Sequence, residues 1–239
     1  MCAAADLCMK SSFTRTDLVA VTVVAFLAIA MLLPGCEQNR VGARRAQCAN
    51  NEIELSKALL GYEGQNRQFP GYRQTLANVD AGWGVMILPQ IERNDLWQEW
   101  KQGKVRKARI PLMICPLDLP PTSGPEDGWS SYAVNTHVCG DGAGLSLGYI
   151  ASKDGVANTL LLAENLRSMK PHTWWDTEPK VVGFTDGPLA YNVQSNHGGG
   201  ANVTFCDGHS LFLHDEIDDD VYKALVTPDG GEKVDLDKL

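Results

Sequence analysis

The chain has 239 residues, of which 44% are hydrophobic and six are Trp, and its formal net charge is −8 at pH 7. This apolar content excludes a disordered chain, since it is enough to form a sizeable core. The acidic balance argues against nucleic acid as a partner, because binding to phosphates needs clustered basic side chains.

An uncharged, apolar run from Leu18 to Cys36 reads LVAVTVVAFLAIAMLLPGC. A helix of this length rises about 1.5 Å per residue and just spans a hydrocarbon core of roughly 30 Å. The alternative is a cleaved secretory signal, which has a shorter apolar region and an A-x-A-like site. No such site follows Pro34. The run therefore predicts a retained membrane anchor.

The rest of the chain is organised around this anchor. We expect a leader-like segment at 1–17, the anchor at 18–36, a helical extension at 37–65 and a globular α+β domain at 66–239. Two adjacent stripes recur at helical spacing in the extension: Ala49, Ile53, Ser56 and Leu60, and Cys48, Leu55, Leu59 and Tyr62. Together they predict a broad face that packs on the domain, and Phe69-Pro70-Gly71 ends the helix.

Shorter elements follow in the domain. Asn94–Trp100 predicts a short helix, with its apolar residues on one side. Strand-like runs lie at Ile110–Cys115, Ser130–Val138, Thr159–Ala163 and Lys180–Phe184.

The clearest local pattern is a β-hairpin at 201–214. Two strand-like runs flank Asp207-Gly208, a pair favoured in two-residue type I′ turns because both positions need positive φ. In that register Val203 faces Phe212 and Thr204 faces Leu211.

Four of the seven cysteines, Cys48, Cys115, Cys139 and Cys206, lie in the domain, without a C-x-x-C pair for zinc. Two disulfides in an oxidising compartment and buried free thiols both fit this pattern.

Two patterns conflict on which side of the membrane the domain lies. Arg40, Arg44 and Arg45 follow the anchor and favour a cytoplasmic domain by the positive-inside rule. The domain cysteines have little use in a reducing cytosol without a metal motif. We expect a single-pass protein of the cytoplasmic membrane with its C-terminal domain extracytoplasmic.

FTRTDLVAVTVVAFLAIAMLLP, at 13–34, resembles the start of type IV prepilins and pseudopilins. The resemblance implies processing between Ser12 and Phe13, and pairing of Asp17 with a neighbouring subunit during assembly. The family has Gly in place of Ser12 and Glu in place of Asp17. These departures weigh against processing and against filament assembly.

Further segments resemble one prepilin-like family, the domain of unknown function 1559. They are RRAQCANN at 44–51, ICPLD at 114–118, DGVANTLLLAEN at 154–165, and a His-X9-Asp-Gly motif formed by His197, Asp207 and Gly208. The resemblance implies a pilin-like fold, with a long N-terminal helix packed on an antiparallel sheet, and implies no known activity. Cys48 and Cys115 lie in these motifs, so we expect a bridge between them, and a second between Cys139 and Cys206.

A catalytic pair of His197 and Asp207 is disfavoured by geometry. A strand rises about 3.3 Å per residue, so the six residues 201–206 hold the two roughly 20 Å apart. We expect separate structural roles: Asp207 takes the first turn position, and His197 forms a hydrogen bond near the strand's start, with Glu164 a candidate partner.

Other candidate sites have weaker support. Ser146 matches G-x-S-x-G, but a Gly-rich loop precedes it where a nucleophile elbow needs a strand. An acidic run has oxygen ligands for calcium but lacks EF-hand spacing: Asp215, Glu216, Asp218, Asp219 and Asp220. An acidic turn capping a helix at Asp220–Leu225 is favoured instead.

The predicted function is that of a membrane-anchored pilin-like or pseudopilin-like structural or secretion-associated protein without catalytic activity or cofactor. Its expected partners are the membrane and other pilin-like or secretion-system subunits. The alternative is an anchored extracytoplasmic binding domain or lipoprotein, with or without calcium, that does not assemble. Leu33-Pro34-Gly35-Cys36 resembles a lipobox with an unusual proline, which makes Cys36 the candidate lipidation site.

Overall fold

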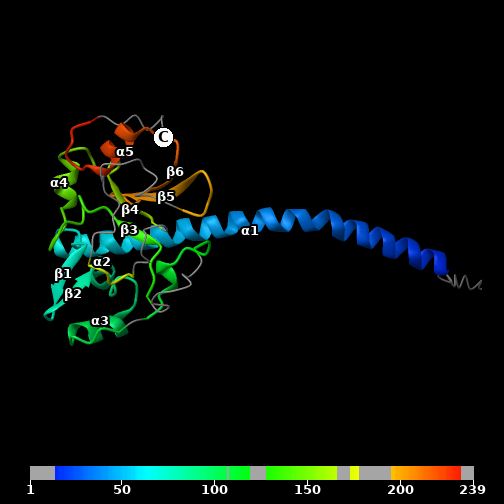
Figure 1. Cartoon of the computed structure of the whole chain (residues 1–239), viewed down its shortest axis with the longest axis horizontal. Helices are drawn as coiled ribbons and strands as arrows, with labels where there is room; N and C mark the ends of the chain where they lie inside the picture. Colours follow the sequence, from blue (N-terminus) through cyan, green and yellow to red (C-terminus); the bar gives the residue numbers. More distant parts are fainter. Residues whose placement is uncertain (1–13, 107, 119–127, 166–172, 178–194, 233–239) are drawn as a thin grey trace, which may run out of the picture. The chain divides into compact units, whose positions relative to one another are not determined.

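Figure 1 shows the computed structural model of the chain. It describes residues 14–106, 108–118, 128–165, 173–177 and 195–232, and the side chains of 29–41 lie outside this description. The chain divides into two compact units, Met1–Ala43 and Arg44–Leu239.

The first unit contains the beginning of helix α1, which runs Arg15–Asn66. Thr14 and Asp17 close its N-terminus as a capping box: the Thr14 amide donates to Asp17 Oδ2 at 2.9 Å, and the Asp17 amide donates to Thr14 Oγ1 at 3.3 Å. Apolar side chains that are 51–75% exposed follow the cap: Leu18, Val19, Val21, Val23, Val24, Phe26 and Leu27.

Among the described residues, no helix combines the length and the apolar content needed to cross a membrane. The predicted anchor at 18–36 extends into 29–41, outside the described side chains, and stays a prediction.

From Arg44 onward α1 belongs to the second unit. One predicted stripe is fully in the core: Cys48, Leu55, Leu59 and Tyr62 are buried. In the adjacent stripe Ser56 is buried, and Ala49, Ile53 and Leu60 are half-buried. The predicted packing face of this helix is therefore confirmed. The helix ends at Asn66, and the next residue, Arg67, has a φ of 64°.

A four-stranded antiparallel sheet forms the centre of the second unit. Its strands, in spatial order, are β3 Tyr132–Val134, β4 Leu160–Glu164, β5 Gly200–Phe205 and β6 Ser210–His214. The strands predicted at 130–138 and 159–163 and the hairpin at 201–214 are confirmed, since each is rich in the β-branched and aromatic residues that suit a pleated surface. The fold is α+β with antiparallel sheets, as predicted.

The two faces of this sheet are covered by different helices, the second half of α1 and α5, Asp219–Val226 (Figure 1). The residues that pack with the buried stripe of α1 include Tyr132, Val134 and Leu162. The opposite face packs on Tyr222, Leu225 and Val226 of α5 through Ala133, Leu160, Ala163, Val203, Phe205 and Leu213. Because successive strand residues point to opposite faces, Tyr132 and Ala133 belong to different layers of the core.

The acidic run before α5 caps this helix. Asp218 Oδ1 accepts from the amides of Asp220 at 2.9 Å and Val221 at 3.4 Å. Asp219 and Asp220 lie in the first turn, where carboxylates face the positive end of the helix dipole. The favoured interpretation of this run is confirmed, with the helix starting one residue earlier than expected.

The predicted register of the β5–β6 hairpin is wrong by one residue. Val203 pairs with Leu211, and Thr204 pairs with Ser210. The loop has three residues, 206–208, because the Phe205 amide donates to the carbonyl of His209 at 3.0 Å.

Asp207 also differs from its predicted turn conformation. Gly208 has a φ of 89° and its amide donates to the Phe205 carbonyl at 2.9 Å, as in three-residue hairpin loops with a left-handed glycine. Asp207 is not among the described residues with positive φ. Only the glycine of the pair therefore takes the conformation that the sequence assigned to both.

The described part of the second unit holds six further short elements: β1 Arg73–Leu76, β2 Val79–Gly82, α2 Trp83–Met86, α3 Asn94–Lys101, η1 Pro111–Met113 and α4 Leu147–Ala151. Helix α3 confirms the helix predicted at 94–100. The strand predicted at Ile110–Cys115 is wrong, because Pro111 starts a 3-10 turn there. The β1–β2 hairpin was not predicted, since Ala77 gives no turn signal although its φ is 51°. The strand predicted at Lys180–Phe184 lies outside the described residues.

Candidate functional site

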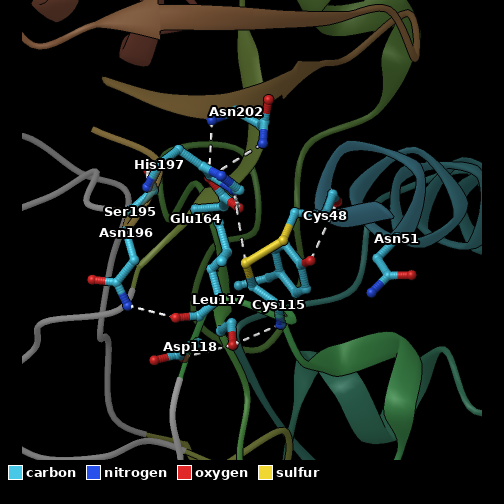
Figure 2. Close-up of polar contacts among 12 residues, drawn as sticks. Cys48, Asn51, Cys115, Leu117, Asp118, Glu164, Ser195, Asn196, His197 and Asn202 are labelled. Atoms are coloured by element: carbon cyan, nitrogen blue, oxygen red, sulfur yellow. Dashed lines mark hydrogen bonds and ion pairs between the residues drawn. A yellow bond between two sulfur atoms is a disulfide. The ribbon is translucent and has the colours of Figure 1, made fainter. Parts of the chain in front are cut away.

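Residues that are far apart in the sequence meet on the α1-facing side of the sheet (Figure 2). Cys48 comes from α1, Cys115 from the loop after η1, Glu164 from the end of β4 and His197 from the segment before β5. One sulfur, nitrogen or oxygen atom from each lies within 4.8 Å of those of the other three. All four side chains are fully buried. We refer to these residues as the Cys-Cys-Glu-His cluster.

The predicted Cys48–Cys115 disulfide is present, with 5.0 Å between the Cα atoms and 67 residues between the cysteines along the chain. Two further bonds reinforce it. Asn51 Nδ2 donates to the Ile114 carbonyl at 3.1 Å, and the Tyr132 hydroxyl donates to the Cys48 carbonyl at 3.2 Å. The bridge therefore fixes α1 to the η1 loop, and the Tyr132 hydrogen bond fixes it to the sheet.

The second predicted bridge is not formed, because Cys139 and Cys206 are buried free thiols. Burial raises the pKa of both, and the neighbouring Cys139 raises the pKa of Cys206 further. Protonated thiols of this kind pack as small apolar groups and are poor nucleophiles. Among the described residues, this pair takes no part in a group of three or more metal-ligating side chains.

His197 pairs with Glu164, the partner considered from the sequence. Its Nε2 lies 2.9 Å from Glu164 Oε1 and 3.7 Å from Cys115 Sγ. Glu164 Oε2 accepts from the Asn202 amide at 3.0 Å and from Asn202 Nδ2 at 3.4 Å. The His197 amide donates to Ser195 Oγ at 3.0 Å, which orients the loop. His197 Nδ1 is buried without a hydrogen-bond partner among the described residues.

A second buried carboxyl lies near Glu164. Glu52 follows Cys48 by one helical turn, has no exposed surface, and neither of its oxygens has a hydrogen-bond partner in the described part of the chain. Burial raises the pKa of Glu52 well above its ordinary value, and the charge of Glu164 raises it further. Because an unpaired buried charge is costly, these surroundings favour the protonated, neutral form of the Glu52 carboxyl.

Asp118, from the same loop as Cys115, connects the cluster to the neighbouring chain segment. Its Oδ2 accepts from Ser131 Oγ at 2.7 Å and from Trp129 Nε1 at 3.0 Å. Ser131 Oγ in turn accepts from the Cys115 amide at 3.0 Å. Burial raises the pKa of Asp118 to about 6, although both hydrogen bonds oppose this shift. These bonds fix the loop that carries Cys115.

The arrangement acts as a cross-link in this conformation. The disulfide joins α1 to the η1 loop, and the His197–Glu164 bond joins the segment before β5 to the end of β4. Because the four side chains have no exposed surface, a dissolved substrate has no direct access to them.

The other half of the predicted His-X9-Asp-Gly motif lies at the hairpin loop, away from the partners of His197. Asp207 Oδ1 accepts from the His209 amide at 3.0 Å and contacts His209 Nδ1 at 2.6 Å. A Cβ on Gly208 would lie 3.2 Å from Leu60 Cδ1, so this glycine also allows close approach of α1. His197 and Asp207 have separate contacts, as the sequence predicted.

The remaining candidates are not brought together with the cluster. Ser146 is the N-cap of α4 and accepts from the Tyr149 amide at 3.1 Å. Ser12 and Phe13 lie outside the described residues, as does the side chain of Cys36. The acidic run is exposed and, among the described residues, forms no metal-ligand group: Asp215, Glu216, Asp218, Asp219 and Asp220.

Sequence reasoning missed Glu52 and Asn202. Glu52 lies on the buried stripe, four residues after Cys48, but the stripe was identified from its apolar members. A glutamate at a core position of a helix is the pattern that would have indicated it. Asn202 gave no comparable signal, because the sequence does not show that its side of the strand is buried.

Comparison with known families gives a match over part of the chain. Residues 37–144 match a family described as a protein of unknown function (DUF1559). The match covers Cys48 and Cys115 and ends before Glu164 and His197. It confirms the predicted resemblance to this domain of unknown function over the matched residues. No curated protein and no solved structure matches the chain.

Proposed function

We propose that the chain is a membrane-anchored, pilin-like structural or secretion-associated protein with an extracytoplasmic domain. The observation that carries this proposal is the change in the surroundings of α1 along its length. Apolar side chains between Leu18 and Leu27 are 51–75% exposed, whereas Cys48, Leu55 and Leu59 have no exposed surface. An exposed apolar run of this kind needs a cover, and the uncharged stretch to Cys36 is long enough for lipid to supply it.

The packing of the second half of α1 supports the pilin-like part of the proposal. This half lies against one face of an antiparallel sheet, which is the arrangement implied by the resemblance of 13–34 to prepilins. The Cys48–Cys115 disulfide supports an extracytoplasmic domain, because disulfides persist in oxidising compartments.

In this proposal the His-X9-Asp-Gly motif is structural. His197 fixes the start of β5 through Glu164, and Asp207-Gly208 forms the loop at its far end. The motif thus positions both ends of one strand beneath α1, and no catalytic step is assigned to it.

A second candidate is an anchored binding domain or lipoprotein that does not assemble. It is favoured by Asp17, whose carboxylate accepts hydrogen bonds from the amide and the hydroxyl of Thr14 at 2.9 and 2.6 Å. A carboxylate engaged in its own helix cap is less available to a neighbouring subunit. Ser12, in place of glycine, argues in the same direction.

The test is the state of the protein in isolated membranes. We expect wild type to need detergent for extraction, and the Val21→Lys/Val24→Lys variant to become soluble with its disulfide intact. The control places two lysines on the exposed surface of the same helix, Gln47→Lys/Asn50→Lys, and should stay in the membrane. Wild type that is soluble without detergent contradicts the proposal.

Mass spectrometry of the extracted N-terminus separates the two candidates. A chain beginning at Phe13 supports a processed pilin-like subunit. A diacylated Cys36 supports the lipoprotein, and an intact chain supports an anchored protein without processing.

A further inference from the structure

We propose that the Cys-Cys-Glu-His cluster is a zinc site when its disulfide is reduced. The ligands are the thiolates of Cys48 and Cys115, Nε2 of His197 and Oε1 of Glu164. The inference does not depend on the membrane anchor, since all four residues lie in the second compact unit.

The ligand atoms are already close to the positions that a tetrahedral ion requires. With Zn–S bonds of about 2.3 Å and Zn–N and Zn–O bonds of about 2.0–2.2 Å, ligand atoms lie roughly 3.3–3.8 Å apart. Cys115 Sγ and His197 Nε2 are 3.7 Å apart, and His197 Nε2 and Glu164 Oε1 are 2.9 Å apart. All four ligand atoms lie within 4.8 Å of one another. The sulfur atoms of Cys48 and Cys115 must separate to about 3.8 Å, and breaking their bond permits this.

The kinds of ligand also fit zinc. Thiolate and imidazole are preferred by zinc, and carboxylate is the third common protein ligand. Four protein ligands with no exposed surface are typical of a closed structural site, where no position is open to solvent. The second oxygen of Glu164 is held by Asn202, which supports the carboxylate from outside the ligand set.

Two balanced steps convert one form into the other. A thiol reductant supplies two electrons and two protons, the Cys48–Cys115 sulfur bond breaks, and the reductant becomes its own disulfide. Zinc then forms two Zn–S bonds as the two thiols release their protons to solvent. His197 binds through the Nε2 lone pair as its Nδ1–H tautomer, and Glu164 binds through Oε1.

The second thiol pair of the same core provides an internal comparison. Cys139 and Cys206 are also buried and also near each other, but no third metal-ligating side chain joins them among the described residues. Zinc binding should therefore follow the thiols that have His197 and Glu164 beside them. The metal would hold α1 to the η1 loop in a reducing environment, in place of the disulfide.

The experiment measures zinc in the full-length protein in detergent, by native mass spectrometry, and uses cobalt as a spectroscopic probe. After reduction and removal of the reductant, we expect one tightly bound zinc and a thiolate-to-cobalt charge-transfer band. The oxidised protein should show neither. Cys139→Ala/Cys206→Ala should keep both signals, and Cys48→Ala/Cys115→Ala should lose both.

His197→Ala and Glu164→Gln test the other two ligands, and each should lose the stoichiometric zinc after reduction. Formation of the Cys48–Cys115 disulfide in the oxidised form of each variant shows that it still folds. Reduced wild type that binds no zinc overturns the proposal. So does zinc that persists when His197 and Glu164 are both replaced, or that depends on Cys139 and Cys206.

Discussion

The two faces of the central sheet are built from different chemistry. The face toward α5 is covered by aliphatic and aromatic side chains such as Val203, Phe205 and Leu213. The face toward α1 is also buried but holds Glu164 and Asn202, with Glu52 opposite them on the helix.

This difference indicates a division of roles between the two faces. An apolar layer stabilises a fold in proportion to the area it removes from water, without fixing one arrangement. A buried polar layer adds less net stability, but its partners must meet in one geometry. We infer that the α5 face contributes to stability through apolar burial alone, and that the polar groups of the α1 face determine how the helix is held.

The largest effect is expected on the apolar face. Phe205→Ala should destabilise the domain by about 3–5 kcal/mol, because Phe205 is fully buried and its loss leaves a cavity. Phe212, half-buried on β6 with the Arg45 guanidinium 3.5 Å from its ring centre, is the matched control. Phe212→Ala should cost only about 1 kcal/mol. Urea denaturation measures both, and equal losses would contradict the proposed division.

The cross-link on the polar face gives the next largest effect. In the presence of a zinc chelator, reduction of wild type should lower the free energy of unfolding by about 2–4 kcal/mol, as expected for a long disulfide loop. Cys139→Ala/Cys206→Ala should show the same difference between oxidised and reduced samples, and Cys48→Ala/Cys115→Ala should show none. A wild type that is insensitive to reduction would mean that the bridge adds no stability.

Replacement of Glu52 should show how much the buried polar layer lowers the free energy of unfolding. Glu52→Leu is expected to stabilise the protein by about 1–3 kcal/mol at pH 7, since it removes a buried carboxyl without a hydrogen-bond partner among the described residues. Glu54, two residues away, is 57% exposed and pairs with Lys57. Glu54→Leu should change the unfolding free energy by less than about 0.5 kcal/mol. Destabilisation by Glu52→Leu would show that this carboxyl has a partner that stabilises the fold.

The smallest effect concerns the pH dependence contributed by Asp118. Its pKa is raised to about 6 from 3.8, so the folded state holds a proton that the unfolded state has lost. The contribution of Asp118 to the free energy of unfolding is therefore fully present below about pH 4 and is lost as pH rises through about 6. Because the side chain is partly exposed, we expect a loss of only about 1 kcal/mol.

Asp118→Asn should reduce the fall in stability between pH 4 and 6 by about that amount, because Asn still accepts the bonds from Ser131 and Trp129. Thermal unfolding across this pH range measures the difference. A profile identical to that of wild type would show that Asp118 has an ordinary pKa.

Periodic patterns predicted the parts of the fold that depend on local sequence. The stripe through Cys48 and Leu55 predicted the packing face of α1, and the alternation around Asp207-Gly208 predicted the hairpin. The register failed because a left-handed Gly208 closes a three-residue loop as readily as a two-residue one.

The cluster itself could be predicted only in part. The family-like motifs contained Cys48, Cys115, Glu164 and His197, and the first bridge and the candidate pairing of His197 with Glu164 followed from them. Glu52 was missed because hydrophobic periodicity cannot reveal a charged residue at a core position. The state of Cys139 and Cys206 was not predictable, because a buried thiol packs as well as a bridged one.

The central proposal is that α1 is a membrane anchor in its first half and part of a folded domain in its second half. The most direct measurement inserts a specific protease site after Ala43, at the boundary of the two units, and cleaves the protein in isolated membranes. We predict release of a soluble fragment beginning at Arg44 that retains the Cys48–Cys115 disulfide, while the N-terminal fragment stays with the membrane. A cleaved domain that remains membrane-bound, or an N-terminal fragment that is released with it, would contradict the account.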